Sequence, residues 1–238
     1  MNLIEKKENQ IVFLVKTEES LVNAVRRYVN EILILAIDEV EIFKNDSALY
    51  DETIAHRIGL IPLKTEAGSK KEADLKLTSN KEGFVYSGEL KGNAEIVYDK
   101  IPITLLNKGQ ELEILAKAKL GKGSEHSKFS PGIMFYRNSA EITMDKEFAD
   151  KVKKILPKAD IKEKGNKIII QDNQKESYAE FCEGIAEKGR KKAEVEYKED
   201  LVISVESYGQ INVKDVFLKS IKELKLDLDD VSKKVEKA

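Results

Sequence analysis

Apolar and polar positions near the start of the chain predict a strand, a helix and a second strand. The run from Ile11 to Val15 is β-branched and aromatic, which is typical of a buried strand. Residues 17–20 supply an N-cap candidate and acidic side chains that suit the first turn of a helix. Partial alternation from Ala36 to Phe43 then indicates a half-buried strand.

The helix that follows Ser20 carries two stripes of residues at helical spacing. Its apolar stripe consists of Leu21, Val25, Tyr28, Val29 and Ile32. Its polar stripe consists of Asn23, Arg26, Arg27 and Asn30. We expect the apolar stripe to pack into the chain's own core. The polar stripe fits a solvated face and also fits a surface that pairs with a partner's carboxylates, and the pattern alone does not decide between them.

The middle of the chain consists of shorter runs. Residues 51–63 predict a short helix that turns at Gly59, whereas residues 65–81 are polar and predict an exposed loop. Strand-like runs separated by turn residues then indicate a small antiparallel sheet, at residues 84–86, 95–98 and 112–115. A compact helix–strand–helix piece is predicted next, at residues 146–156, 167–171 and 178–189.

The end of the chain mirrors its start. Alternation from Leu201 to Glu206 predicts a strand, and Asn212 is a candidate N-cap for a final helix. Apolar residues then recur at alternating spacings of four and three, at Phe217, Ile221, Leu224, Leu228 and Val231. This spacing is typical of a helix that packs along one other helix. A seam of about two heptads fits a partner's helix and also fits the chain's own sheet.

Composition narrows the class of protein. The 238 residues include 35% charged side chains, more than the usual quarter, so the surface is heavily charged. Lys and Arg (41) nearly balance Asp and Glu (43), which argues against binding nucleic acid through a bulk positive field. The N-terminus lacks a long apolar stretch, so we expect neither a signal peptide nor a membrane span, and a cytoplasmic protein.

The residues that suggest catalysis do not have the spacing that catalysis needs. Gly121 and Gly123 lie too close together for a phosphate-binding loop. His126 lies among serines, but the sequence has no Gly-x-Ser-x-Gly turn of a hydrolase. Cys182 is the single cysteine and falls on the apolar face of a predicted helix, which favours a buried, inert thiol. We therefore predict no catalytic residues and no metal site on this chain.

Four blocks of sequence nevertheless resemble a known family, the alpha-type subunits of DNA-dependent RNA polymerase. The blocks are residues 23–27 with 36–40, residues 51–63 (DETIAHRIGLIPL), residues 121–131 and residues 205–210. The family comprises the bacterial alpha subunit, its archaeal counterpart (called D) and the eukaryotic third-largest subunit. The second block is close to the archaeal and eukaryotic form, and the blocks occur in the family's order, so the chain is identified as a member of archaeal type.

The resemblance implies an α+β fold. Residues 1–43 and 197–238 would form a discontinuous dimerisation domain, a mixed sheet with two helices. Residues 44–145 would form an inserted, mainly β domain, and residues 146–196 a small helix–strand–helix subdomain. The resemblance also implies a non-catalytic assembly subunit that pairs with a smaller subunit, called L. The pair would recruit the large catalytic subunits and the small subunits N and P, and DNA would be contacted only indirectly within the complex.

The resemblance also assigns roles to particular residues. The interface with subunit L would include Leu21, Ala24, Tyr28, Phe217, Ile221, Leu224 and Leu228. Docking of a large subunit would use Asn23, Arg26, Arg27 and Arg57. Many archaeal relatives carry cysteines for an iron–sulfur cluster in the small subdomain, but a cluster needs about four cysteines and this chain has only Cys182. We therefore expect no cluster and no other cofactor.

Two alternatives remain open from the sequence. A free-standing nucleic-acid-binding module would use the Lys-rich stretches at residues 188–192 and at Lys70-Lys71, and would bind DNA in a salt-dependent way. A small hydrolase would depend on His126.

Overall fold

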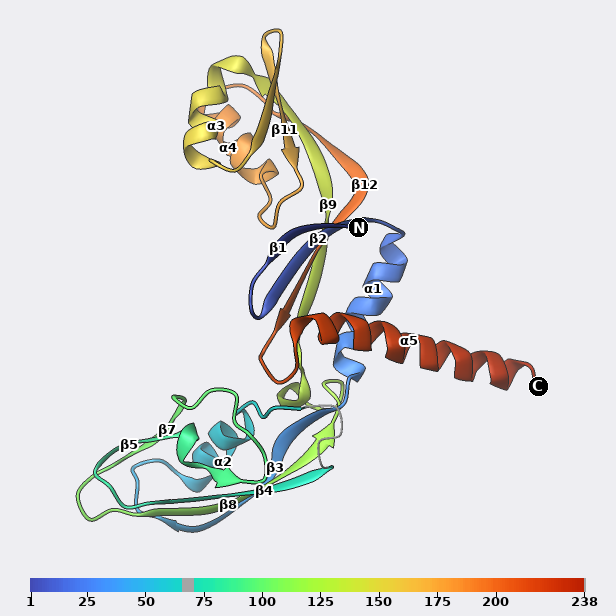
Figure 1. The fold of residues 1–238 in the computed structure, drawn as a ribbon. Coiled ribbons are helices and arrows are strands. Elements are labelled where there is room, and N and C mark those ends of the chain that lie inside the picture. Colours follow the sequence, from blue (N-terminus) through green and yellow to red (C-terminus); the bar gives the residue numbers. More distant parts are fainter. Residues whose placement is uncertain (66–70, 238) are drawn as a thin grey trace. The chain divides into compact units, whose positions relative to one another are not determined.

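Antiparallel strands with a few helices packed against them make up most of the chain (Figure 1). The computed structural model describes residues 1–65 and 71–237. The contacts divide the chain into two compact units, each assembled from separate stretches of sequence. The first unit contains residues 1–23 and 134–205, and the second contains residues 24–133 and the chain from Glu206 onward. The fold is α+β, as predicted, and the domain boundaries implied by the resemblance stay a prediction.

A long sheet is the frame of the first unit, and its strands follow the order β1-β2-β12-β9-β11-β10. In chain order they are Asn2–Lys6 (β1), Gln10–Lys16 (β2), Gly132–Asp145 (β9), Asp160–Lys164 (β10), Lys167–Asp172 (β11) and Glu194–Ser207 (β12). The strands predicted near Ile11, Lys167 and Leu201 are confirmed as β2, β11 and part of β12. The hairpin partners β1 and β10 were not predicted.

Two helices pack on β9 and β11 in the first unit. They are α3 (Ala149–Ile155), which begins as a 3₁₀ turn over Lys146–Phe148, and α4 (Ala179–Lys188). Both confirm predicted helices. Their shared core contains Ile142, Met144, Phe148, Val152, Ile168, Ile170, Tyr178 and Cys182. These residues form the apolar faces of the two helices and the strands, and their packing stabilises this piece.

The second unit contains a sheet with the order β3-β8-β4-β6 and a separate strand pair, β5 with β7. These strands are Ile34–Asn45 (β3), Glu72–Ser79 (β4), Gly83–Tyr86 (β5), Lys91–Gly92 (β6), Pro102–Leu106 (β7) and Leu112–Gly121 (β8). The helix α2 (Asp51–Gly59) packs on the sheet through Ile54 and Ile58, which are fully buried. Leu75, Leu77 and Ile114 belong to the same core.

Two predictions in this unit were wrong. Residues 72–79 do not form a loop but the strand β4, which pairs with β8 and buries every second side chain. The charged residues at the alternate positions face solvent, and their number concealed the period-two pattern. The remainder of the predicted loop, residues 66–70, lies outside the described residues. The strand predicted at residues 95–98 is reduced to an isolated bridge between Ile96 and Leu63.

Helices at the two ends of the chain complete the fold. The first is α1 (Glu19–Tyr28), which tightens into a 3₁₀ turn over Val29–Glu31 (η1). The last is α5 (Val213–Val235), a single uninterrupted helix (Figure 1). No helix within residues 1–65 and 71–237 is long and apolar enough to cross a membrane.

Candidate partner interface

The start of α5 is anchored in the second unit. The Asn212 side chain accepts a hydrogen bond of 3.0 Å from the backbone N–H of Lys214, as an N-cap does. Val213, Val216 and Ser220 are buried. Beyond Ser220 the described part of the helix has no buried residue. The first two turns of α5 therefore belong to the chain's own core, and the remaining turns do not.

The exposed part of α5 nevertheless carries an apolar seam. The seam, as we call it from here on, consists of Phe217, Ile221, Leu224, Leu228, Val231 and Val235, at alternating spacings of four and three. Phe217 and Leu224 are half-buried, whereas Leu228 is 60% exposed. The seam continues about one turn beyond the last position that we predicted. Apolar residues in this heptad pattern normally pack into the holes of a second helix, whereas Leu228, Val231 and Val235 are exposed.

The helix α1 buries a slightly different face from the one predicted. Val22, Val25 and Val29 are buried, as is Ile32 beyond the helix end. Leu21 was expected on this face but is 52% exposed. The stripe was wide enough to fit two rotations of the helix, and the structure selects the one that leaves Leu21 outside the core.

The predicted interface residues are only partly brought together. Ala24 and Tyr28 on α1 and the seam on α5 belong to the second unit, whereas Leu21 belongs to the first. The Tyr28 hydroxyl donates a hydrogen bond of 2.9 Å to an Asp227 carboxylate oxygen, which joins the end of α1 to α5. Because Asp227 accepts this hydrogen bond, the pKa of Tyr28 is raised. Asp227 was not predicted, since its role depends on a contact between residues distant in the sequence.

The four residues predicted to dock a large subunit lie on two helices. Asn23, Arg26 and Arg27 are on α1, and Arg57 is in the last turn of α2. The three arginines are exposed and Asn23 is half-buried. Exposed guanidinium groups suit the bidentate pairing with carboxylates that a docking surface uses. Their assignment to a large subunit stays a prediction.

The first and third sequence blocks are joined by an ion-pair network. Asp38 on β3 lies 2.7 Å from the Lys119 ammonium and 2.6 Å from the Lys128 ammonium. These hydrogen bonds, that of Lys119 first, hold the pKa of Asp38 below its ordinary value. Lys128 is only 13% exposed, so its pairing with Asp38 compensates for much of the cost of removing its charge from water.

Further contacts hold the glycine-containing block against the end of α1. The Lys122 ammonium lies 3.1 Å from the Glu31 carboxylate. The Ser130 hydroxyl donates to the Asn30 side-chain oxygen at 2.9 Å, and the Ser124 backbone N–H donates to the Asn30 carbonyl at 3.1 Å. A Cβ at Gly123 would lie 2.7 Å from the same Asn30 side-chain oxygen, so a larger residue there would have to displace the Asn30 side chain.

The other two blocks meet the same region. The Tyr208 N–H donates to the Pro131 carbonyl at 3.0 Å. The Thr65 N–H, just after the second block, donates to the Gln210 carbonyl at 2.8 Å, while the Thr65 hydroxyl accepts from the Leu35 N–H at 3.1 Å. The four blocks therefore converge in the second unit. Their polar residues build a framework that supports the end of α1 and the segment before α5.

The surroundings of Cys182 and His126 show what these two side chains do in the fold. Cys182 is fully buried in the core between α3 and α4, and burial raises its pKa to about 11. A thiolate ligand is disfavoured there, and the sequence offers no second thiol. His126 caps the 3₁₀ turn at Ser127–Phe129, its Nδ1 accepting from the Lys128 N–H at 3.1 Å. Among the described residues, no group of three or more possible ligands is placed to hold a metal.

Comparison with known proteins agrees with the family resemblance of the four sequence blocks. Residues 15–135 match the family model described as the RNA polymerase Rpb3/RpoA insert domain. The chain is 38% identical to DNA-directed RNA polymerase subunit Rpo3 of Pyrococcus furiosus, over 66% of this chain and 67% of that protein. It is 30% identical to subunit Rpo3 of Methanosphaera stadtmanae over 89% of each chain, and 31% identical to that of Methanothermobacter thermautotrophicus over 92% of each.

Proposed function

Because the chain belongs to the alpha-type RNA polymerase subunits, the Rpb3/RpoA family, we propose that it is the assembly subunit on which an archaeal polymerase is built. Membership makes it a component of a DNA-directed RNA polymerase. In the proposed role it carries no catalytic residues. It pairs with the smaller subunit L, and the pair then recruits the large catalytic subunits.

The single observation that carries this proposal is the exposed seam on α5. A helix with an apolar face is normally packed, because exposed apolar surface in contact with water is unfavourable. The seam runs over five spacings of four and three residues and lies largely outside the chain's core. Such a heptad pattern matches one partner helix rather than a sheet. The proposed occupant is therefore a helix of subunit L.

The direction in which the seam faces is set by contacts of its own unit. Ser220 is buried and its hydroxyl donates to the Phe217 carbonyl at 2.8 Å, while Asp227 holds the Tyr28 hydroxyl. These contacts fix the helix on one side and leave the seam to a partner. Obligate interfaces of this kind bury more than about 2,000 Å² in total and have apolar centres.

The large subunits are proposed to dock on the exposed arginines of α1 and α2. Arg26, Arg27 and Arg57, with Asn23, would pair with carboxylates of the second-largest or largest subunit. The small subunits N and P would join the same assembly, and DNA would be reached only through the complex. The protein is proposed to work in the cytoplasm and without an iron–sulfur cluster, a proposal that the burial of Cys182 supports.

The alternatives have less support. Lys191, in the Lys-rich stretch of the nucleic-acid hypothesis, is already paired with Asp145 and Glu147. Lys70 lies outside the described residues. Nδ1 of His126 accepts a backbone hydrogen bond, which leaves the proton of the neutral ring on Nε2, the nitrogen that a hydrolase would need as a base. No specific contact in the described chain favours either function.

A pull-down with matched variants tests the proposal. Tagged chain would be co-expressed with a candidate subunit L, in the form of wild type, Leu228→Asp and Leu226→Asp. Leu228 is in the seam, whereas Leu226 is 50% exposed on the opposite side of the same helix. We expect subunit L to be retained by wild type and by Leu226→Asp, and lost from Leu228→Asp. Equal retention by both variants would contradict the proposed interface.

A further inference from the structure

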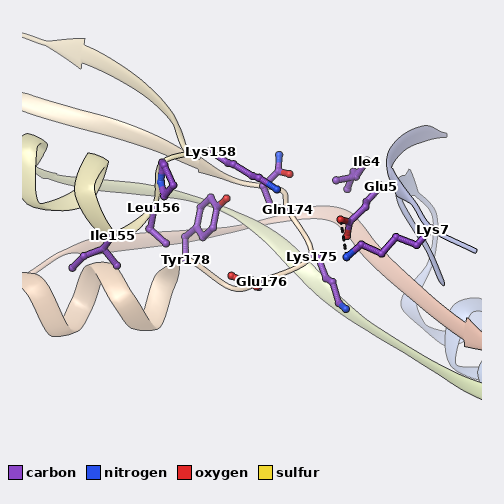
Figure 2. Close-up of a pocket in the computed structure, with 11 residues that line it drawn as sticks. Ile4, Glu5, Lys7, Ile155, Leu156, Lys158, Gln174, Lys175, Glu176 and Tyr178 are labelled. Atoms are coloured by element: carbon purple, nitrogen blue, oxygen red, sulfur yellow. Dashed lines mark ion pairs between the residues drawn. The ribbon is translucent and has the colours of Figure 1, made fainter. Parts of the chain in front are cut away.

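A cavity of about 550 Å³ lies in the first unit, away from the seam (Figure 2). One wall is the loop that connects β11 to α4, one is the end of α3, and one is the β1–β2 hairpin. Its volume falls in the range of small-molecule sites. No sequence motif pointed to it, because its residues come from three distant segments.

The loop wall is held in place by a buried ion pair. Arg137 on β9 lies 2.6 Å from the carboxylate of Asp172, whose side chain is 1% exposed. The same guanidinium donates to the carbonyls of Gln174 at 2.7 Å and Glu176 at 2.9 Å. Asp172 also accepts from the Ala179 N–H at the start of α4. The wall is therefore preorganised rather than adaptable, as binding sites usually are.

Tyr178 presents an unpaired hydroxyl to this cavity. The residue is 4% exposed, and its ring packs in the core of the first unit. Figure 2 shows its hydroxyl directed toward the side of Gln174 and Lys158. Within the described chain, this hydroxyl makes no hydrogen bond. The Tyr178 hydroxyl is not one of the buried atoms that lack a partner, so it is open to the cavity and available to donate to a ligand atom.

The charges around the cavity select the ligand class. Lys7, Lys158 and Lys175 line it together with Glu5 and Glu176, which leaves one net positive charge. Lys7 is paired with Glu5 at 3.0 Å, whereas Lys158 has no ion pair within the described residues. The pKa of Glu5 is lowered, by Lys7 first and by Lys158 and Lys175 at longer range. A single further negative charge would balance the set, and a doubly charged phosphate monoester would exceed it.

We propose that this cavity binds a small organic acid with one carboxylate and a short apolar body. The carboxylate would accept a hydrogen bond from the Tyr178 hydroxyl and pair with the Lys158 ammonium. The apolar body would lie against Ile4, which lines the cavity on the side of Lys158 and Gln174 (Figure 2). Burial raises the pKa of Tyr178, so its hydroxyl keeps its proton and acts as the donor. The site is independent of the seam and adds ligand binding to the assembly role.

NMR of the full chain with labelled isoleucine methyl groups tests this site directly. Phenylpropionate would be titrated in, with phenylpropionamide and phenyl phosphate as matched probes. We expect phenylpropionate to shift the methyl signal of Ile4, and to bind at least about tenfold more tightly than the amide. Equal binding of the amide, tighter binding of phenyl phosphate, or an unchanged Ile4 signal would each overturn the proposal.

Variants assign the binding to the proposed groups. Tyr178→Phe removes only the hydroxyl and keeps the ring in the core, and Lys158→Met removes the charge but keeps the stem. Each should weaken phenylpropionate about tenfold, with the spectrum of the rest of the chain unchanged. Lys154→Met, an exposed position on α3 outside the cavity, should bind like wild type. Wild-type affinity in both Tyr178→Phe and Lys158→Met would show that the anion site lies elsewhere.

Discussion

The hydroxyl of Tyr28 lies 2.9 Å from a carboxylate oxygen of Asp227 and donates a hydrogen bond to it, across 199 residues of sequence. This contact joins the end of the first helix to the flank of the seam on the last helix. Asp227 stands one residue before Leu228 and three after Leu224, so it borders the seam without belonging to it. The start and the end of the chain thus build the proposed partner surface together.

Removing this contact should change the ionisation of Tyr28 more than the stability of the chain. The hydrogen bond to Asp227 raises the pKa of Tyr28, so Asp227→Asn should return that pKa toward its ordinary value of 10.0. Because the pair is exposed, the loss in unfolding free energy should stay below about 1 kcal/mol. Ultraviolet absorbance during alkaline titration measures the pKa of Tyr28, and denaturant unfolding measures the unfolding free energy. An unchanged tyrosine titration would show that the hydrogen bond is absent in solution.

Truncating apolar side chains of the seam should weaken the binding of subunit L. Phe217→Ala or Leu224→Ala should each cost on the order of 2 kcal/mol or more of binding free energy, because each removes large apolar contacts with the proposed partner helix. Leu226→Ala, on the opposite side of α5, is the control and should bind like wild type. Isothermal titration or surface capture with purified subunit L gives the affinities. A Phe217→Ala chain that pairs with unchanged affinity would be incompatible with the assignment.

Stability should depend on the ionisation of Asp38. The Lys119 and Lys128 ammonium groups hold its folded-state pKa below the ordinary value of 3.8. Its contribution is therefore full above that value and is lost as the pH falls through the lowered folded-state pKa. Asp38→Asn should destabilise the chain at about pH 7, and the gap to wild type should narrow at about pH 3. The exposed neighbour Glu39, as Glu39→Gln, is the control. A gap of constant size at both pH values would remove Asp38 as its source.

Cys182 should be unreactive in the folded chain. Burial raises the pKa of its thiol to about 11, so almost none of it is thiolate at about pH 8, and the core excludes reagents. Ellman's reagent should label the chain rapidly in guanidinium chloride and far more slowly without it. Anaerobically purified protein should lack the visible absorption of an iron–sulfur cluster. Fast labelling of the native chain, or a cluster band in the spectrum, would contradict the role given to this residue.

Removing only the arginine from the ion pair between Arg137 and Asp172 should lower the unfolding free energy of the chain. Arg137→Met leaves the Asp172 carboxylate buried without its cation and removes the donors to the loop carbonyls. The expected loss is about 3 kcal/mol of unfolding free energy. Arg137→Met combined with Asp172→Asn should recover part of it, because the remaining buried charge is gone. Denaturant unfolding measures both, and a single variant as stable as wild type would mean that the pair is not buried in solution.

Sequence patterns predicted elements well where one physical signal dominated. The β-branched run at β2, the heptad spacing of α5 and the helical faces of α3 and α4 are each strong periodic signals, and all four elements are confirmed. The strand β4 was missed because Glu72, Asp74 and Lys76 made it look like a loop, although Ala73, Leu75 and Leu77 alternate with them. Pairing with β8 makes this segment a strand, and the sequence of the segment alone does not contain the information about that pairing.

The residues of the candidate interface and of the cavity also divide into those that sequence patterns predict and those that they do not. The seam is visible in the sequence because its spacing is local. Asp227 as a partner of Tyr28, Asp38 as a partner of Lys128 and the hydroxyl of Tyr178 in a cavity all depend on contacts between distant segments. Sequence periodicity has no access to such contacts. Only the four sequence blocks, which converge in the second unit, indicated from the sequence that this unit carries features of the family.

The most direct test of the assembly role is light scattering after size-exclusion chromatography, on the chain alone and on the chain co-expressed with a candidate subunit L. An exposed seam predicts self-association or poor solubility of the chain alone, and a stable one-to-one complex when subunit L is present. A well-behaved monomer that is indifferent to subunit L would contradict the proposed interface. The membership of the chain in the polymerase family would then stand without the assembly role.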